Sequence, residues 1–146
     1  MLSRKRKTSW CCAGYGYTSV CKTSAFGSPC EMPCDGTNLT DCARTSTQIC
    51  YSEIVELLAN GSSPTGVMFD QKSASAWADY VHPVTKKRSQ VWFDTPGTLA
   101  IKMAELREAG VRGVSFWQSG CLNATAPDGQ WDAMWDAITA FRGPSE

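Results

Sequence analysis

The sequence lacks both a net charge and any long hydrophobic run. Fourteen basic side chains balance fourteen acidic ones over 146 residues, so no overall field favours nucleic acid or a membrane surface as a partner. No apolar run approaches the roughly 18 residues that a membrane-spanning helix needs. Hydrophobic residues make up 42% and charged residues 19%, which is typical of a folded domain. We therefore expect a domain of ordinary size with no nucleic-acid and no membrane partner.

Histidine is scarce, and no C-x-x-C pair occurs. The single histidine, His82, precedes a proline in a predicted turn, where a solvated loop residue is expected rather than a ligand or base. The spacing of Cys30 and Cys34, followed by Cys42 and Cys50, leaves a four-thiolate zinc site as a weak alternative. No Ser-His-Asp order and no glycine-rich phosphate loop is present. We expect no metal and no cofactor.

Cysteine itself is abundant, and most of it lies in the first third of the chain. An even number of cysteines with irregular spacing indicates disulfides and an oxidising compartment, although the pairing cannot be deduced. Three Asn-x-Ser/Thr motifs also favour the secretory route. The disulfide candidates are Cys11, Cys12, Cys21, Cys30, Cys34, Cys42, Cys50 and Cys121, and the glycosylation candidates are Asn38, Asn60 and Asn123.

The first nine residues form a basic segment of different character. The run Arg4–Lys7 is followed by no apolar stretch of the kind that a signal peptide requires, so no signal peptide is expected in this chain. A nuclear-localisation or nucleic-acid role for this run is an alternative. The dense cysteines and the glycosylation motifs argue against it.

Hydrophobic periodicity and turn residues predict helices and strands in alternation, without an internal repeat. The helix over 51–58 is expected to be capped by Ser52 and to end at Asn60-Gly61. The expected elements are a strand from Trp10 that runs into a glycine-rich bend by Tyr17, an irregular disulfide-tied excursion over 18–49, that helix, a strand at 67–70, a hairpin of 76–81 and 89–93, a helix over 99–106, a strand at 114–117 and a helix over 131–141.

The stretch from 90 to 122 has the order loop, amphipathic helix, turn, buried strand and tryptophan. Thr95, Pro96 and Thr98 suit a helix start, and Gly110 suits its end. This order is the repeating half-unit of a (β/α)8 barrel, whose binding residues lie at the carboxyl ends of strands. Trp117 therefore falls where such an enzyme holds a substrate ring, although burial in a core explains a tryptophan there equally well.

The acidic residues offer no catalytic pair. Asp94 follows a strand end, which makes it the most interesting carboxylate, but it also serves the turn before Pro96. Asp128, Asp132 and Asp136 recur every four residues and are expected to share the solvated face of the last helix. We assign no catalytic residue.

Two segments, AGYGYTSVC and QVWFDTPGTLAIKMAELREAGVRGVSFWQSGC, resemble the C-terminal part of family 18 glycoside hydrolases, and the di-N-acetylchitobiase branch above all. The resemblance extends from Trp10 to Phe141. It implies an α/β fold: strands 7 and 8 and helices 7 and 8 of a (β/α)8 TIM barrel, with a Cys-rich excursion and a hairpin between them. The barrel would be incomplete. The basic segment 1–9 would then precede a family domain over 10–142, with a tail at 143–146, in a chain that does not begin where its relatives begin.

The resemblance also implies roles for four side chains. Trp117 matches the strand-eight tryptophan under the N-acetylglucosamine that is cleaved, and Tyr15 matches a tyrosine that lines the same cleft. Tyr17 stands where many members have arginine, and Tyr17 and Asp94 are possible rim residues. The strand-seven proline of the family is missing near Cys12.

One family motif is absent altogether. No D-x-x-D-x-D-x-E run occurs in the sequence, and its glutamate is the general acid of a retaining, substrate-assisted mechanism in the family. The resemblance implies a lysosomal or extracellular glycosidase acting on N-acetylglucosamine-containing chito-oligosaccharides or on the chitobiose core of N-glycans. We expect this chain alone to be inactive and to need the rest of the barrel. The alternatives are a non-catalytic carbohydrate-binding domain and a disulfide-rich secreted domain without a sugar ligand.

Overall fold

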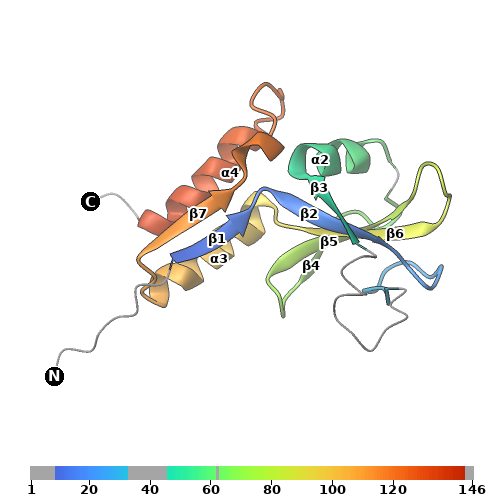
Figure 1. The fold of residues 1–146 in the computed structure, drawn as a ribbon, viewed down its shortest axis with the longest axis horizontal. Coiled ribbons are helices and arrows are strands. Elements are labelled where there is room, and N and C mark those ends of the chain that lie inside the picture. The colour runs from blue at the N-terminus through green and yellow to red at the C-terminus, as the bar shows by residue number, and fades with distance from the viewer. Residues whose placement is uncertain (1–8, 33–45, 62, 144–146) are drawn as a thin grey trace. The chain divides into compact units, whose positions relative to one another are not determined.

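The computed structural model describes residues 9–32, 46–61 and 63–143. The chain divides into two compact units, each labelled by its elements in Figure 1. Unit 1 comprises Met1–Gly14 and Asp94–Glu146, and unit 2 comprises Tyr15–Phe93. Unit 2 is therefore one continuous segment inserted between the two parts of unit 1.

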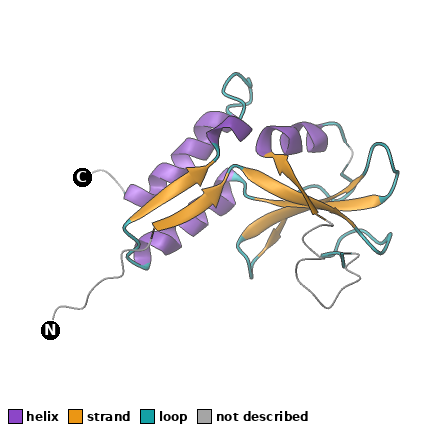
Figure 2. Cartoon of the chain, viewed as in Figure 1, coloured by secondary structure: helices purple, strands orange, loops and turns teal. Residues whose placement is uncertain are grey.

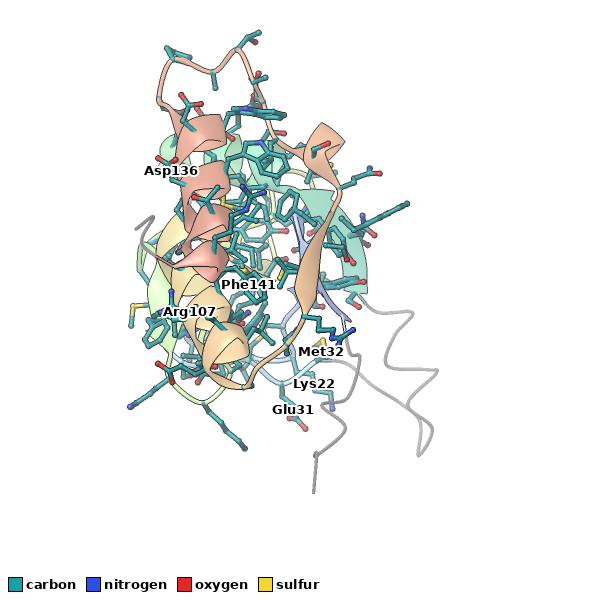
Figure 3. The ribbon with its side chains drawn as sticks, turned by 90° about the vertical axis from the view of Figure 1, so that its left-hand side faces the viewer. Lys22, Glu31, Met32, Arg107, Asp136 and Phe141 are labelled. Atoms are coloured by element: carbon teal, nitrogen blue, oxygen red, sulfur yellow. A yellow bond between two sulfur atoms is a disulfide. The ribbon has the colours of Figure 1, made fainter. Side chains whose placement is uncertain are left out.

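Unit 1 consists of a parallel pair of strands and two helices. Strand β1 (Ser9–Ala13) pairs in parallel with β7 (Gly113–Trp117), so that Ala13 lies opposite Trp117. Helices α3 (Pro96–Glu108) and α4 (Gln130–Thr139) pack against each other and lie on the same side of the strand pair (Figures 2 and 3). Two short 3-10 turns, η1 (Ser119–Cys121) and η2 (Ala140–Arg142), follow β7 and α4.

Helix α3 is longer than the predicted 99–106, but the residues expected to start and end it do so. The Thr95 side chain accepts a hydrogen bond from the Thr98 amide, and the Thr98 hydroxyl accepts one from the Thr95 amide, so two free donors are satisfied. Gly110 ends the helix at a φ of +70°, which glycine adopts at little cost. Leu99 is buried on the inward side of this helix, whereas Ile101 is exposed.

The core of unit 1 consists of aliphatic and methionine side chains, with a cluster of half-buried aromatic rings beside them. Leu99, Met103 and Met134 are fully buried, and the Trp135 ring packs 5.6 Å from Phe116 and 5.7 Å from Trp131, between ring centres. Burying a side chain of this size contributes about 1.5–3 kcal/mol. This core fixes β7 against α4.

Unit 2 is a five-stranded antiparallel sheet with one helix (Figure 2). The strand order is β3-β2-β6-β5-β4, with helix α2 (Tyr51–Ala59) following β3. The strands are β2 (Tyr15–Val20), β3 (Ser46–Cys50), β4 (Met68–Asp70), β5 (Ser75–Val81) and β6 (Arg88–Phe93).

The predicted hairpin of β5 and β6 is confirmed, but the prediction of irregular structure over 18–49 is wrong at both ends of that segment. Residues 18–20 complete β2 and residues 46–50 form β3, where no regular structure was expected. Both segments are polar, and the ladder formed by β2 with β3 and β6 holds them in the sheet. Pairing with distant strands outweighs their weak local preference.

Helix α2 begins at Tyr51 as predicted and ends at Asn60-Gly61, but the predicted cap is wrong. Its N-cap is Cys50 rather than Ser52, and the Glu53 carboxylate accepts a hydrogen bond from the Cys50 amide. Ile54 and Tyr51 are buried, Asn60 is the C-cap, and Gly61 follows at a φ of +67°. The helix therefore begins directly where β3 ends.

Helix α2 covers one face of the sheet, and Gly16 permits its close approach. A Cβ atom at Gly16 would lie 2.5 Å from the Trp92 carbonyl oxygen and 2.8 Å from both Ile54 Cδ1 and Phe93 Cβ. Val91 and Ala78 on the same face are fully buried. This face and α2 form the core of unit 2.

The opposite face holds a buried polar network that anchors the segment 21–32. Arg88 donates to Asp79 through Nε at 2.9 Å and pairs with it through Nη2 at 2.8 Å. Gln90 donates to Asp79 Oδ1 at 3.0 Å and accepts from the Cys30 amide at 3.0 Å. The Gly27 amide donates to Asp79 Oδ2 at 2.8 Å. Three side chains of the sheet thus hold a loop without regular structure.

Disulfides are confirmed in part. Cys21 and Cys30 form one, and Cys50 and Cys121 also take part in disulfides, which contradicts the zinc alternative because two of its four thiolates are oxidised. Cys12 was wrongly included among the candidates: it is a buried thiol in β1, where cysteine packs as a small hydrophobic residue. The side chains of Cys11, Cys34 and Cys42, which were also candidates, lie outside what the structure describes.

Within the described ranges, no helix is long and apolar enough to cross a membrane. In the same residues, no group of three or more His, Cys, Asp or Glu side chains is placed to hold a metal ion.

Candidate functional site

The candidate site in unit 1 is the carboxyl end of the β1–β7 pair. Because the strands are parallel and in register, Ala13 and Trp117 end together. The next residue, Gly14, donates its amide hydrogen to the Trp117 carbonyl at 2.8 Å. A Cβ atom at Gly14 would lie 2.7 Å from the Gln118 carbonyl oxygen and from Phe116 Cζ, so the close approach requires glycine.

Trp117 is not a core residue. Its exposed fraction is 62%, which overturns the interpretation of this tryptophan as a buried aromatic. The peptide bond between Trp117 and Gln118 is cis, and the chain continues through η1 to Cys121, which is buried and disulfide-bonded. An indole is thus presented to solvent from a strand whose other aromatic, Phe116, packs inward on α4.

Tyr15 and Tyr17 belong to unit 2, where they lie on one face of β2. Their ring centres are 5.6 Å apart and their planes meet at 86°, a favourable edge-to-face arrangement. Tyr15 is half-buried and Tyr17 has an exposed fraction of 50%. The structure brings these two predicted residues together, whereas Trp117 stands in the other unit.

A cavity of about 370 Å³ opens beside Tyr17. Tyr17 lies opposite Trp92 on β6, and Trp92 lies opposite Trp77 on β5, with the two indoles stacked at 5.9 Å. The Trp92 indole N–H donates to Gln90 Oε1 at 2.9 Å, which fixes the ring. The cavity is lined by Tyr17, Ser19, Cys30, Met32, Ser46, Gln90 and Trp92.

This cavity has the composition of a small-molecule site. Ligand sites are mainly apolar, hold a few placed polar groups and have volumes of about 300–1,000 Å³. Of the lining residues, Tyr17 was predicted from the sequence, whereas Trp92, Gln90 and Met32 were not. The sequence of β6 shows the period-two alternation of a strand. Only the register between β2 and β6 determines which side chain of β6 lies opposite Tyr17.

Asp94, one of the predicted rim residues, has strong structural partners. Its Oδ1 atom accepts hydrogen bonds from Lys102 Nζ at 2.6 Å and from the Thr98 hydroxyl at 3.0 Å. The side chain is largely buried at the start of α3, where a negative charge is favourable. These contacts explain Asp94 as a stabiliser of the helix start.

The three aspartates predicted to share a helix face lie before or on α4. Asp128 precedes α4 rather than lying on it, and accepts from the Gln130 amide at 3.2 Å. Asp132 and Asp136 are on the exposed face of α4, as Figure 3 shows for Asp136. The Ser73 hydroxyl and amide, which both donate to Asp70, lower the pKa of that carboxyl, whereas a general acid needs a raised one.

His82 and two of the three glycosylation candidates lie in turns or next to them. His82 Nδ1 accepts from the Thr85 amide at 3.2 Å within the β5–β6 turn. Asn60 is exposed at the end of α2, and Asn123 Oδ1 accepts from the Thr125 hydroxyl at 2.9 Å, so the motif is folded back on itself. Asn38 lies outside the described residues.

Among curated proteins, the chain matches di-N-acetylchitobiases. It is 31% identical over 114 residues to a probable di-N-acetylchitobiase 2 of Dictyostelium discoideum, which covers 76% of this chain and 28% of that protein. It is 29% identical over 131 residues to di-N-acetylchitobiase of Rattus norvegicus, covering 85% and 34%. The chain thus spans about a third of the length of these relatives. No family model matches it.

Among solved structures, the neighbours are chitinase-like folds. A chitinase from Chromobacterium violaceum superposes with a TM-score of 0.59 at 16% identity, covering 92% of this chain and 32% of that one. A class V chitinase mutant from Cycas revoluta, in complex with (GlcNAc)3, gives 0.55 at 20% identity, covering 87% and 32%. A chitinase-like agglutinin from Robinia pseudoacacia gives 0.59 at 15%, covering 90% and 31%.

These likenesses define an α/β fold similar to the TIM barrels of chitinases, with a mixed set of parallel and antiparallel strands. The chain is a homologue of the di-N-acetylchitobiases, and its structural neighbours are family 18 chitinases, as the sequence motifs predict.

Proposed function

We propose that this chain is the C-terminal part of a chitobiase-like glycoside hydrolase domain, covering residues 10–142, and that it supplies sugar-binding side chains to the cleft. In this proposal β1 and β7 are strands 7 and 8 of the barrel, α3 and α4 are helices 7 and 8, and unit 2 is the excursion between them. The observation that carries the proposal is Trp117, an exposed indole at the carboxyl end of a parallel strand pair.

The ligand we propose is an oligosaccharide that contains N-acetylglucosamine, such as a chito-oligosaccharide or the chitobiose core of an N-glycan. One face of a pyranose ring carries mainly C–H groups, which an indole or phenol ring can cover. Trp117 and Tyr15 are the proposed contact residues, and Tyr17 is a rim residue. The homology to di-N-acetylchitobiases supports this class of ligand.

In this proposal the chain does not supply the proton donor. The sequence holds no D-x-x-D-x-D-x-E run. Asp94 and Asp128 accept hydrogen bonds at helix starts, and Asp132 and Asp136 are exposed on α4. General acid catalysis typically contributes about 10²–10⁴-fold to such a reaction. Hydrolysis by the family's substrate-assisted route therefore needs residues from the remaining strands of the barrel. The disulfides and the exposed Asn60 motif support a lysosomal or extracellular location and glycosylation.

Calorimetric titration of the full chain with chitotetraose tests the binding role. We expect Trp117→Ala to abolish measurable binding and Trp117→Phe to retain part of it, because a phenyl ring still covers a sugar face. Ile101→Ala, an exposed apolar residue on α3, is the matched control and should bind as the parent does. Unchanged affinity in Trp117→Ala would contradict the proposal.

A chromogenic chitobioside tests the catalytic part separately. We expect the chain alone to release no chromophore above the blank. Appreciable turnover that persists after purification would show that a proton donor exists within these residues.

The cavity beside Tyr17 favours a second candidate, a non-catalytic carbohydrate-binding domain. Its aromatic lining lies entirely in unit 2, and one structural neighbour is a chitinase-like agglutinin. Binding that survives Trp117→Ala but is lost in Trp92→Leu would favour this candidate. Loss of neither would favour a disulfide-rich secreted domain without a sugar ligand.

A further inference from the structure

A second hollow in unit 2 is lined by basic residues and lies apart from the aromatic cavity. It has a volume of about 470 Å³ and lies between the chain after β2 and the start of β6. Its lining comprises Val20, Cys21, Lys22, Thr23, Ser24, Lys86, Lys87 and Arg88. None of these residues lines the cavity beside Tyr17.

One backbone hydrogen bond joins the two walls of this hollow, and a second hydrogen bond and a disulfide brace the wall that follows β2. The Cys21 amide donates to the Arg88 carbonyl at 3.0 Å, and the Lys22 amide donates to the Glu31 carbonyl at 3.0 Å. The disulfide between Cys21 and Cys30 closes the same segment. The basic side chains therefore project from a fixed frame rather than from a free loop.

Two of the four positive charges that line this hollow have no counter-charge among the described residues. Arg88 is buried and paired with Asp79 at 2.8 Å, so its charge is already balanced. Lys22 forms a longer ion pair with Glu31, with 3.5 Å between Nζ and Oε1. Figure 3 shows these two labelled side chains close together. Lys86 and Lys87 are exposed and form no ion pair with any described residue.

Hydroxyl groups add hydrogen-bond donors beside these charges. The Thr23 oxygen accepts from Arg88 Nη1 at 3.3 Å, which leaves its hydrogen able to donate toward the hollow. Ser24 lies next to it and is exposed. Ammonium and hydroxyl donors are groups that bind oxyanions, and Glu31 is the one described carboxylate that competes for a lysine of this hollow.

We propose that this basic hollow, defined by Lys22, Thr23, Lys86 and Lys87, binds a saccharide that carries sulfate or phosphate esters. The positive charges of the lysines favour an oxyanion as the ligand. The hollow is larger than one tetrahedral anion, so the oxyanion is expected to be carried by a larger molecule. The site is independent of Trp117, so it does not rest on the proposed glycosidase relationship. Binding of the charged groups is weakened by salt, because the lysines are exposed.

The test is a calorimetric titration of the full oxidised chain at low ionic strength. The probes are a heparin-derived tetrasaccharide, a phosphorylated oligomannose and neutral chitotetraose. We expect the charged saccharides to bind, and the double variant Lys86→Gln/Lys87→Gln to weaken binding by roughly fivefold. Glu31→Gln should tighten binding, since it releases Lys22. Affinity for chitotetraose should not change in either variant.

Lys72 provides the matched control. It is an exposed lysine of unit 2 outside the hollow, so Lys72→Gln should bind as the parent does. All variants keep the basic run Arg4–Lys7, so this run cannot cause a difference between them. Equal loss of saccharide affinity in Lys72→Gln, or no loss in the double variant, would overturn the proposed site. Equal affinity for a single-stranded oligonucleotide of the same charge would also overturn it, by showing attraction to any polyanion.

Discussion

At Gly16 the absence of a side chain determines how closely helix α2 approaches the sheet. We predict that Gly16→Ala destabilises unit 2 by about 1–3 kcal/mol. The new methyl would lie 2.5 Å from a backbone oxygen of β6, which cannot move without disturbing the ladder. Denaturant unfolding followed by circular dichroism measures the change in free energy.

Gly113→Ala is the control for Gly16→Ala. A Cβ atom there meets nothing within 4 Å, so the free energy of unfolding should change by no more than about 0.5 kcal/mol. Equal effects of the two substitutions would show that the contact with Ile54 and Trp92 does not limit the packing.

Two ion pairs of the chain should differ sharply in their contribution to stability. The Asp79 and Arg88 side chains are 0% and 2% exposed, whereas Asp94 and Lys102 are 13% and 28% exposed. Removing Asp79 leaves a buried guanidinium without a counter-charge, so Asp79→Ala should cost about 3–5 kcal/mol. Asp94→Ala leaves Lys102 able to reach water and should cost about 1 kcal/mol.

Chemical denaturation of both variants measures this difference. Comparable losses for Asp79→Ala and Asp94→Ala would mean that water reaches Arg88 in solution. This contrast could not be predicted from the sequence. All four residues are ordinary surface types, and only the fold buries one pair.

At the scale of elements, the disulfide between Cys21 and Cys30 should hold the segment 22–29 on the sheet. We predict that Cys21→Ser/Cys30→Ser lowers stability by roughly 2–3 kcal/mol, the value expected for closing a loop of this length. The Gly27 amide, which donates to Asp79, should then exchange its hydrogen faster.

Hydrogen exchange measured residue by residue tests this. Amides in the β5–β6 ladder are the internal reference and should keep their protection, because their partners lie in the sheet. Faster exchange throughout the ladder would contradict the prediction by showing that the disulfide supports the whole unit.

Elements with strong local signals could be predicted, and those held by distant partners could not. Helix α3 carries its own caps at Thr95 and Gly110, and the β5–β6 hairpin has clear alternation around a turn. Strand β3 is a polar segment that pairs with β2 across an excursion, so nothing local indicates it. The break between β1 and β2 at Gly14 follows from its contact with Trp117 and Phe116, which lie about a hundred residues further along the sequence.

At the scale of the whole molecule, the candidate site was predictable in type but not in composition. Trp117 was predicted as a site residue because it ends the strand that follows a helix. Its exposure to solvent depends on the position of that strand in the folded unit. Trp92 was missed because strand order β3-β2-β6-β5-β4 is a property of the folded sheet. Burial and register are non-local, so sequence patterns specify them weakly.

The division of the chain leads to a last prediction, that the continuous segment 15–93 folds when it is produced alone. It contains all five strands of its sheet, helix α2, the Cys21–Cys30 disulfide and the buried Asp79–Arg88 pair, and a unit with its own core can fold independently. The stacked Trp77 and Trp92 are its only tryptophans, so a near-ultraviolet circular dichroism signal that disappears in denaturant reports their native packing. A flat signal, with rapid exchange of the β2–β6 amides, would show that this sheet depends on unit 1.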